Sequence, residues 1–506
     1  MASKSSVIAK NTLLLYARSV VVMLIAIYSS RVLLSALGVD DYGLYNLVGG
    51  VVSIFSSLKG IFAASVQRFL NYEKGNGNNE RVNEIFNTSV LIHIAIAFLF
   101  IIVVELFGLW YINNKMVLPE GALADAIFVF QCSIITFSVS IITVPYDAVI
   151  IANERMNFYA WISICEAVSK LGAIFLLLVL PFNRVRTYAL LIVIIAVAIR
   201  YASIRYTKRF PECKRKKIWH KDTVKDLTTF AGWNFFGCMA FSLIEEGSNL
   251  IINLFGGVAA NAARAVAYQV KSAISQLSTN VVVASQPLLF QEAANAEKQI
   301  FWNHAFFQTR AVYYFVLITS LPFFVYTPQL LDLWLVEVPE LSVSFIRAVL
   351  IYQLVMTFQK TIDIGFKAYN KMQKYQILDS LTVLISLPVI YFVLKKGAPL
   401  YTAFLVLSVV RIVDYIVLFV LARETLELSI RAFAKSVLLP SFFSLLIAFV
   451  IGFLFYKYCN PYEWYYIVAL CALVVIVFSA TLYALIFSKQ EKDMIVSLVH
   501  SIFHKR

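Results

Sequence analysis

The sequence predicts an all-α polytopic membrane protein, and three observations support this fold class. Of its 506 residues, 60% are hydrophobic and only 14% are charged, and the mean hydropathy is +0.79. The apolar residues form fourteen long runs, and a helix that crosses a bilayer needs about 20 such residues. Fourteen helices leave only short connections, which excludes a soluble catalytic domain. Six cysteines without a CxxC pair or a Cys/His cluster predict neither a disulfide framework nor a zinc site.

Each predicted span is an apolar run bounded by glycine, proline or charged residues. The first run contains Arg18 and Arg31 and is longer than a signal-peptide core, so we expect a retained span rather than a cleaved leader. Six spans precede the longest connection, and they are 11–36, 45–67, 87–111, 124–150, 158–180 and 187–206. Eight spans follow it, and they are 229–254, 259–288, 304–331, 342–366, 373–394, 398–421, 434–456 and 464–487.

Basic residues predict the orientation, because Lys and Arg accumulate in cytoplasmic segments. With the N-terminus inside, the inner segments contain 27 basic residues and the outer segments contain 6. This asymmetry predicts that both termini are cytoplasmic. Ten of the inner residues lie between Arg200 and Lys225, in and around the longest connection. We expect this basic segment to contact anionic membrane lipid, in preference to the alternative of nucleic-acid binding.

The long connection divides the chain into six spans and then eight. Each part has a turn that begins Gly-Val, at Gly38-Val39 after the first span and at Gly257-Val258 after the seventh. Repeats are common in transporters, so we expect two related six-helix lobes; the alternative is that Gly-Val is an ordinary turn. The predicted domains are an N-terminal lobe 1–207, a basic connector 208–226, a C-terminal lobe 227–423, two further spans in 424–488 and an amphipathic cytoplasmic tail 489–506.

Charged residues within the predicted spans are the functional signal, because a charge at bilayer depth costs several kcal/mol unless it faces a partner or a wet cavity. Ten basic residues and six clearly internal acidic residues lie there. Arg18, Arg31 and Lys59 are near enough to a membrane surface to extend their charged ends toward it. Three cations lie near mid-membrane, where this is harder, and they are Lys170, Lys271 and Arg411.

The eighth predicted span has a long polar stripe at helical spacing. The seventh span carries Ser242, Glu245, Asn249 and Asn253 on one face, and Glu245 would reach a depth similar to that of Arg264. Glu246 lies in the same span. Both glutamates are therefore candidate ion-coupling residues, and the alternative is a structural ion pair that only joins the two helices. The stripe is longer than one pair requires, since it comprises Asn261, Arg264, Tyr268, Lys271, Ser275 and Ser278.

Two acid–base pairs have spacings that favour contact within one helix. Glu166 and Lys170 are at i, i+4, and Arg411 and Asp414 are at i, i+3. A membrane carboxylate beside a cation can bind a proton or Na⁺, so Glu166, Lys170 and Asp414 are further candidates for ion coupling. A static salt bridge is the alternative for either pair.

Several motifs in the first third of the chain resemble those of a transporter family. They are Arg31-Val-Leu-Leu-Ser-Ala-Leu-Gly38, Tyr42-Gly-Leu-Tyr45, Val48-Gly49-Gly50, Gln67-Arg68-Phe69-Leu70, Val144-Pro145-Tyr146-Asp147 and Ala152-Asn-Glu-Arg-Met156. With these motifs the chain resembles the polysaccharide-transporter (Wzx-like) branch of the multidrug/oligosaccharidyl-lipid/polysaccharide exporter superfamily, whose members flip lipid-linked oligosaccharides for O-antigen or capsule. The rest of the chain agrees in helix count and in the six-plus-eight layout.

The resemblance implies two lobes around a central cavity that opens alternately to the two sides of the membrane. It also implies that cations in the first, second and eighth helices bind a pyrophosphate headgroup, an anion that guanidinium and ammonium groups suit. The residues of this sequence in those helices are Arg18, Arg31, Lys59, Arg264 and Lys271, and Arg411 is a further substrate-binding candidate.

We therefore expect a transporter, not an enzyme, in a bacterial inner membrane. Its expected cargo is an undecaprenyl-diphosphate-linked oligosaccharide for O-antigen, capsule or exopolysaccharide, moved to the outer leaflet with proton or Na⁺ coupling. We expect it to act as a monomer beside other polysaccharide-assembly proteins, with no cofactor, metal or nucleic acid. One alternative is a multidrug or cation antiporter, which would need carboxylates to predominate in its cavity. Another is a membrane glycosyltransferase, ligase or polymerase, which usually has a larger outer loop than the roughly 5–15 residues present here.

Overall fold

A computed structural model describes residues 4–487 apart from 76–77, 154, 215–220, 295–297, 370 and 460–462. All regular secondary structure in these residues is helical, and twelve helical segments are long and apolar enough to cross a membrane. The chain is therefore an all-α polytopic membrane protein. The predicted amphipathic tail and the centre of the basic connector lie outside the described residues.

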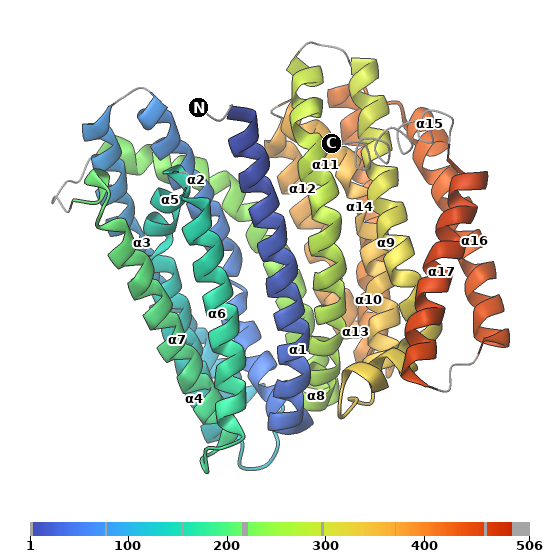
Figure 1. Cartoon of the computed structure of the whole chain (residues 1–506), viewed down its shortest axis with the longest axis horizontal. Coiled ribbons are helices and arrows are strands. Elements are labelled where there is room, and N and C mark those ends of the chain that lie inside the picture. The colour runs from blue at the N-terminus through green and yellow to red at the C-terminus, as the bar shows by residue number, and fades with distance from the viewer. Residues whose placement is uncertain are drawn as a thin grey trace. The chain divides into compact units, whose positions relative to one another are not determined.

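The helices run in chain order from α1 to α17, with a short 3₁₀ helix η1 and a π-helical turn η2 (Figure 1). The first are α1 (Lys4–Ser53), α2 (Ser56–Gly75), α3 (Asn79–Asn114), α4 (Leu123–Ile142), α5 (Val144–Ala152), α6 (Met156–Leu177), α7 (Arg184–Thr207), η1 (Pro211–Cys213) and α8 (Lys221–Ala294). The others are α9 (Lys298–Trp334), α10 (Ser342–Met356), α11 (Gln359–Ala368), α12 (Met372–Leu384), α13 (Ser386–Lys395), α14 (Thr402–Leu426), α15 (Ile430–Phe433), η2 (Ala434–Leu438), α16 (Leu439–Tyr458) and α17 (Trp464–Leu485).

The predicted spans correspond to these helices in the same order, with differences at turns and breaks. The predicted span 124–150 consists of α4 and α5, since Pro145 lies in the first turn of a new helix. Two of the long candidate segments, Arg18–Ser53 and Met239–Thr279, each contain one non-helical glycine. These are Gly38 (φ 78°, ψ 174°) and Gly257 (φ 64°, ψ −168°), in a region that favours glycine. Both glycines lie in the Gly-Val turns, and each turn separates two of the predicted spans. The total of fourteen spans therefore remains a prediction.

The described residues fall into two compact units. The first lies within Met1–Val266, Leu335–Glu340 and Asp379–Ala403, and the second lies within Ala267–Trp334, Leu341–Leu378 and Phe404–Arg506. In the first unit, α6 packs against α1 and α7, and Figure 1 shows α6 and α7 side by side. Helix α4 packs against α3 and α7, and α2 packs against α3 and α5. An apolar cluster that includes Val66, Phe86, Tyr146 and Phe210 lies among α2, α3, α5 and the start of the connector.

Polar side chains join the start of the basic connector to the ends of α2, α3 and α5. Asn83 Nδ2 donates to the backbone oxygens of Glu212 and Lys214 at 2.7 and 2.8 Å. The Glu212 carboxylate accepts from Asn153 Nδ2 at 2.7 Å and lies 3.1 Å from Lys74 Nζ. Burial alone would raise the pKa of Glu212, but hydrogen bonds from Asn153, its own backbone amide and Lys74 lower this pKa below its usual value.

Replacing Glu212 by glutamine should lower the thermal stability more at neutral pH than in acid. The reason is that a hydrogen bond to a charged group contributes about 1.5–3 kcal/mol. Because the pKa of Glu212 is depressed in the folded state, its stabilisation is present above the usual value of 4.5 and is lost as the pH falls through the folded-state pKa. Thermal unfolding in detergent at about pH 7 and about pH 4 measures the difference.

The control is Glu80→Gln, which neutralises an exposed carboxylate in the first turn of α3 and should change little. A destabilisation by Glu212→Gln that is equally large at both pH values would contradict the role assigned to the carboxylate charge.

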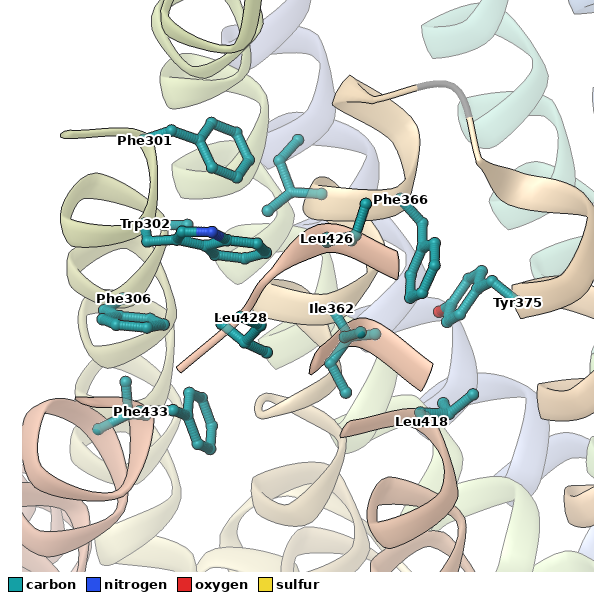
Figure 2. Packing of buried hydrophobic residues seen from close by; sticks show 14 of the residues in the cluster. Phe301, Trp302, Phe306, Ile362, Phe366, Tyr375, Leu418, Leu426, Leu428 and Phe433 are labelled. Carbon is teal, nitrogen blue, oxygen red and sulfur yellow. The ribbon is translucent and has the colours of Figure 1, made fainter. Parts of the chain in front are cut away.

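The second unit has a large aromatic core, which Figure 2 shows from close by. Trp302 and Phe306 on α9 lie in this core, and the Phe306 ring is 5.8 Å from the ring of Phe433 on α15. Phe366 on α11 stacks on Tyr375 of α12 at a centroid distance of 4.9 Å. The contact between Phe306 and Phe433 joins helices that are far apart in the sequence, whereas Phe366 and Tyr375 join consecutive helices.

Helices α16 and α17 also belong to the second unit, and Figure 1 shows them side by side. Many of their large apolar side chains are exposed, including Phe449, Phe453, Trp464 and Ile476. Exposed apolar surface of this extent is unfavourable in water, and a bilayer would cover it.

Candidate functional site

One face of α6 carries the polar residues of a candidate site in the first unit. Tyr159, Ser163, Glu166 and Lys170 are spaced so that their side chains align along one side of the helix. Glu166 lies ten residues after Met156, about 15 Å along a 22-residue helix of about 33 Å. Lys170 Nζ donates to Glu166 Oε1 at 2.8 Å. The contact predicted from their spacing is therefore present, near the middle of a candidate span.

Arg200 on α7 joins this pair to a second carboxylate. Its Nη2 donates to Glu166 Oε2 at 3.1 Å, and its Nη1 donates to Asp147 Oδ2 on α5 at 3.3 Å. The side chains of Arg200 and Asp147 are 14% and 15% exposed, so this ion pair is largely withdrawn from solvent. A guanidinium can bind two carboxylates at once because its N–H groups point in several directions. Arg200 therefore ties α5, α6 and α7 together.

Two further cations reach the same group of residues from α1 and α2. Arg18 Nη1 donates to Ser163 Oγ at 3.3 Å, and its guanidinium lies 5.2 Å from the centre of the Tyr159 ring. Lys59 on α2 interacts electrostatically with both carboxylates and with the cations that bind them. We call the resulting group the α6 charge cluster, and its members are Arg18, Lys59, Asp147, Glu166, Lys170 and Arg200.

The α6 charge cluster has an excess of positive charge. Its four cations and two carboxylates have a formal sum of +2 at neutral pH. Uncompensated charge at membrane depth is costly, and guanidinium and ammonium groups are strong donors to phosphate and carboxylate oxygens. The cluster is thus suited to bind an anion with two negative charges. Its carboxylates can also take up protons when their cations are drawn away.

A second polar group of the first unit lies within α8. Asn261 Nδ2 donates to the backbone oxygen and Oδ1 of Asn249 at 3.0 and 2.7 Å, and Asn253 Nδ2 donates to Asn261 Oδ1 at 3.1 Å. Arg264 Nη2 donates to the backbone oxygen of Glu245 at 2.5 Å. The polar faces predicted for the seventh and eighth spans therefore meet, and they meet through amide side chains as well as through a charged residue.

Helix α1 passes close to this second polar group at Gly50. A β-carbon at position 50 would lie 2.7 Å from Asn249 Nδ2 and 2.8 Å from Glu246 Oε2, so any larger residue would displace these side-chain ends. The candidate residue Glu246 therefore lies beside α1. Arg31, also on α1, is half-buried and is seven residues before Gly38.

The remaining predicted site residues lie in the second unit. Lys271 Nζ is 4.5 Å from the ring centre of Tyr268 and 5.1 Å from that of Tyr352, both within the range of a cation–π interaction. Arg411 Nη1 donates to Asp414 Oδ2 at 3.0 Å. The Arg411 and Asp414 side chains are 2% and 0% exposed. This predicted pair is also present, but it is buried much more deeply than Glu166 and Lys170.

The structure brings together residues for which the sequence predicts different roles. Arg18 and Lys59 are expected to bind the substrate, whereas Glu166 and Lys170 are expected to couple an ion. All four belong to the α6 charge cluster. A site for an anion and a site for a proton would thus share the same charged groups.

Sequence reasoning missed two members of the cluster. Grouping Arg200 with the basic inner segment was wrong, because the residue lies within α7 and bridges two carboxylates. Asp147 was named only as a residue of the motif Val144-Pro145-Tyr146-Asp147, without a predicted role. The position of Arg200 inside the apolar run 187–206 was the sequence feature that could have indicated a charged residue within a span. In the part of the chain that the structure describes, no group of three or more His, Cys, Asp or Glu residues is placed to hold a metal ion.

Comparison with known proteins places the chain in a family. The family described as "Polysaccharide biosynthesis protein" matches residues 8–293, which is more than half of the chain. No curated protein matches the sequence.

Solved structures share the fold at low sequence identity. A structure titled "Lipid II flippase MurJ, inward closed conformation" has a TM-score of 0.68 and 13% identity, and the match covers 93% of this chain and 99% of that one. An inward-facing multidrug resistance MATE family transporter of the MOP superfamily has a TM-score of 0.60 and 15% identity, over 82% and 96%. Its outward-facing counterpart has a TM-score of 0.59 and 13% identity, over 85% and 96%. The fold is therefore that of MOP-superfamily transporters.

Proposed function

The chain belongs to the polysaccharide biosynthesis protein family, and we propose on this premise that it is a flippase for a lipid-linked oligosaccharide. Family and fold are those of transporters, not of enzymes. The proposed cargo is an undecaprenyl-diphosphate-linked oligosaccharide, which moves from the inner to the outer leaflet for O-antigen, capsule or exopolysaccharide. The observation that carries the proposal is the α6 charge cluster, whose formal charge of +2 suits a diphosphate.

The proposed mechanism is alternating access of two six-helix lobes around a central cationic cavity. The lobes are 1–207 and 227–423, joined by the connector 208–226 and followed by two spans in 424–488, which makes fourteen spans in total. The equivalent backbone conformations of Gly38 and Gly257, each at the first turn of a lobe, support a repeat of this kind.

The proposed site residues divide into substrate and coupling groups. The headgroup would bind to cations, while carboxylates beside them would exchange a proton or Na⁺. The substrate group comprises Arg18, Arg31, Lys59, Arg264, Lys271 and Arg411, and the coupling group comprises Glu166, Lys170, Glu245, Glu246 and Asp414. Asp147 and Arg200 join the coupling group because of their contacts with Glu166.

We place the protein in a bacterial inner membrane with both termini in the cytoplasm, acting as a monomer. The excess of basic residues in the inner segments supports this orientation and contact with anionic membrane lipid. The lipid-linked cargo would come from other polysaccharide-assembly proteins, which are the proposed partners.

The double substitution Arg18→Gln with Lys59→Gln should abolish surface glycan without removing the protein from the membrane. It lowers the formal charge of the cluster to zero, and each lost charge-assisted bond weakens headgroup binding by about 1.5–3 kcal/mol. The assay complements a strain that lacks its own copy of the gene and measures surface glycan and protein level.

Lys115→Gln is the matched control for that assay, because Lys115 is exposed and lies beyond the end of α3. It should give normal glycan. Normal glycan from the double variant would exclude the α6 charge cluster as the headgroup site.

The fold shared with multidrug transporters supports a second candidate, a multidrug or cation antiporter. A carrier of cations needs carboxylates to predominate at its site, whereas the α6 charge cluster has twice as many cations as carboxylates. Drug accumulation in cells without other pumps distinguishes the two candidates. A flippase leaves accumulation unchanged, and an antiporter lowers it.

A further inference from the structure

Glu166 already binds the kind of cations that an anionic cargo would need. Its Oε1 accepts from Lys170 at 2.8 Å, and its Oε2 accepts from Arg200 at 3.1 Å. Glu166 is 23% exposed and Lys170 is 41% exposed, so this is the most accessible ion pair of the α6 charge cluster. Phosphate and carboxylate oxygens are negatively charged acceptors with the same preference for guanidinium and ammonium donors.

We infer that Glu166 is an internal competitor of the cargo, so that protonation of Glu166 and binding of a sugar diphosphate favour each other. The inference rests on the proposed function, because it concerns the same headgroup site. Ionised Glu166 holds Lys170 and Arg200, whereas neutral Glu166 releases both to phosphate oxygens. Linkage is reciprocal, so a bound diphosphate must favour the protonated form of Glu166 to the same extent.

The groups around Glu166 give this linkage its direction. Lys170 lies on the same helix, and the charged groups from neighbouring helices are Lys59 of α2, Asp147 of α5 and Arg200 of α7. Arg18 of α1 binds Ser163, which lies one turn before Glu166. A diphosphate that takes Lys170 and Arg200 removes two stabilising cations from Glu166 and brings negative charge beside it. Both changes disfavour the ionised carboxylate.

Asp147 is less suited to this role than Glu166. It is 15% exposed, and its ion pair in the described residues is with Arg200. Glu166 has two cationic partners and sits beside the more exposed Lys170. A ligand that approaches Lys170 therefore meets Glu166 first.

The test measures binding of UDP-N-acetylglucosamine, a soluble sugar diphosphate whose diphosphate diester does not titrate near neutral pH. The full chain in lipid nanodiscs is titrated calorimetrically at about pH 8 and about pH 4. We expect Glu166→Gln to bind about tenfold more tightly than the unaltered protein at the higher pH, and this difference to shrink severalfold at the lower pH. Glu105→Gln is the matched control, because it neutralises an α3 carboxylate that accepts from Gln131 at 3.1 Å.

The outcomes separate the inference from the proposed function. If Glu166→Gln and the unaltered protein bind equally at both pH values, the inference is overturned and the diphosphate site stands. If neither protein binds the probe, the diphosphate site and the inference are both overturned. If Glu166→Gln does not fold, the unaltered protein decides. Its binding of the probe at about pH 4.5, measured in two buffers of different ionisation enthalpy, should show net proton uptake, and no uptake would overturn the inference.

Discussion

Replacing Arg200 by alanine should abolish surface glycan and also lower the thermal stability of the protein. The substitution removes the guanidinium that holds Asp147 on α5 and Glu166 on α6, through hydrogen bonds of 3.3 and 3.1 Å. Each of these charged hydrogen bonds contributes about 1.5–3 kcal/mol. Their loss also leaves two partly buried carboxylates with less compensation, and like charges in one site repel each other. Surface glycan in a complemented deletion strain and thermal unfolding in detergent measure the two effects.

Two companion variants test this explanation. Arg200→Lys keeps the charge but cannot bind both carboxylates in the same way, so it should recover part of the stability and little of the glycan. Arg205→Ala removes an exposed cation from the last turn of the same helix and should behave like the unaltered protein. If Arg200→Ala produced normal glycan, Arg200 would have no part in transport.

Local sequence patterns predicted the contacts that lie within one helix. The i, i+4 spacing of Glu166 and Lys170 predicted their ion pair, and the i, i+3 spacing of Arg411 and Asp414 predicted theirs. Such contacts depend only on helical geometry, which sequence spacing determines. Hydropathy likewise predicted the helices, because backbone groups in a bilayer must be satisfied within each segment.

Contacts between helices could not be predicted in the same way. Arg200 contacts residues 53 and 34 positions away in the chain, and no periodicity relates these positions. Arg200 lies seven residues before the end of α7, close to the basic connector, and was therefore counted with the basic inner segment. The role of Asn253 was hidden for a similar reason, since its amide pairs with the backbone of Val117 beyond α3. Both cases depend on which helices pack together.

Replacing Asp414 by asparagine should destabilise the second unit strongly. Asp414 is 0% exposed and Arg411 is 2% exposed, with 3.0 Å between Arg411 Nη1 and Asp414 Oδ2. Removing one partner of a buried ion pair costs about 3–5 kcal/mol, because the other charge stays buried. The control is Asp363→Asn, which breaks the pair with Lys367. That pair is 28% and 42% exposed, so the change should cost about 1 kcal/mol or less. Thermal unfolding in detergent compares the two variants.

The double variant Arg411→Met with Asp414→Leu separates a structural role of this pair from a role in transport. Apolar side chains of similar volume can replace a buried ion pair with little loss of stability, so the double variant should unfold near the temperature of the unaltered protein. If Arg411 binds substrate and Asp414 couples an ion, as proposed, this stable protein should still fail to produce surface glycan. Normal glycan would mean that the pair only joins parts of the fold. The charges that serve transport would then be sought in the more exposed α6 charge cluster, where a headgroup and a proton can reach them.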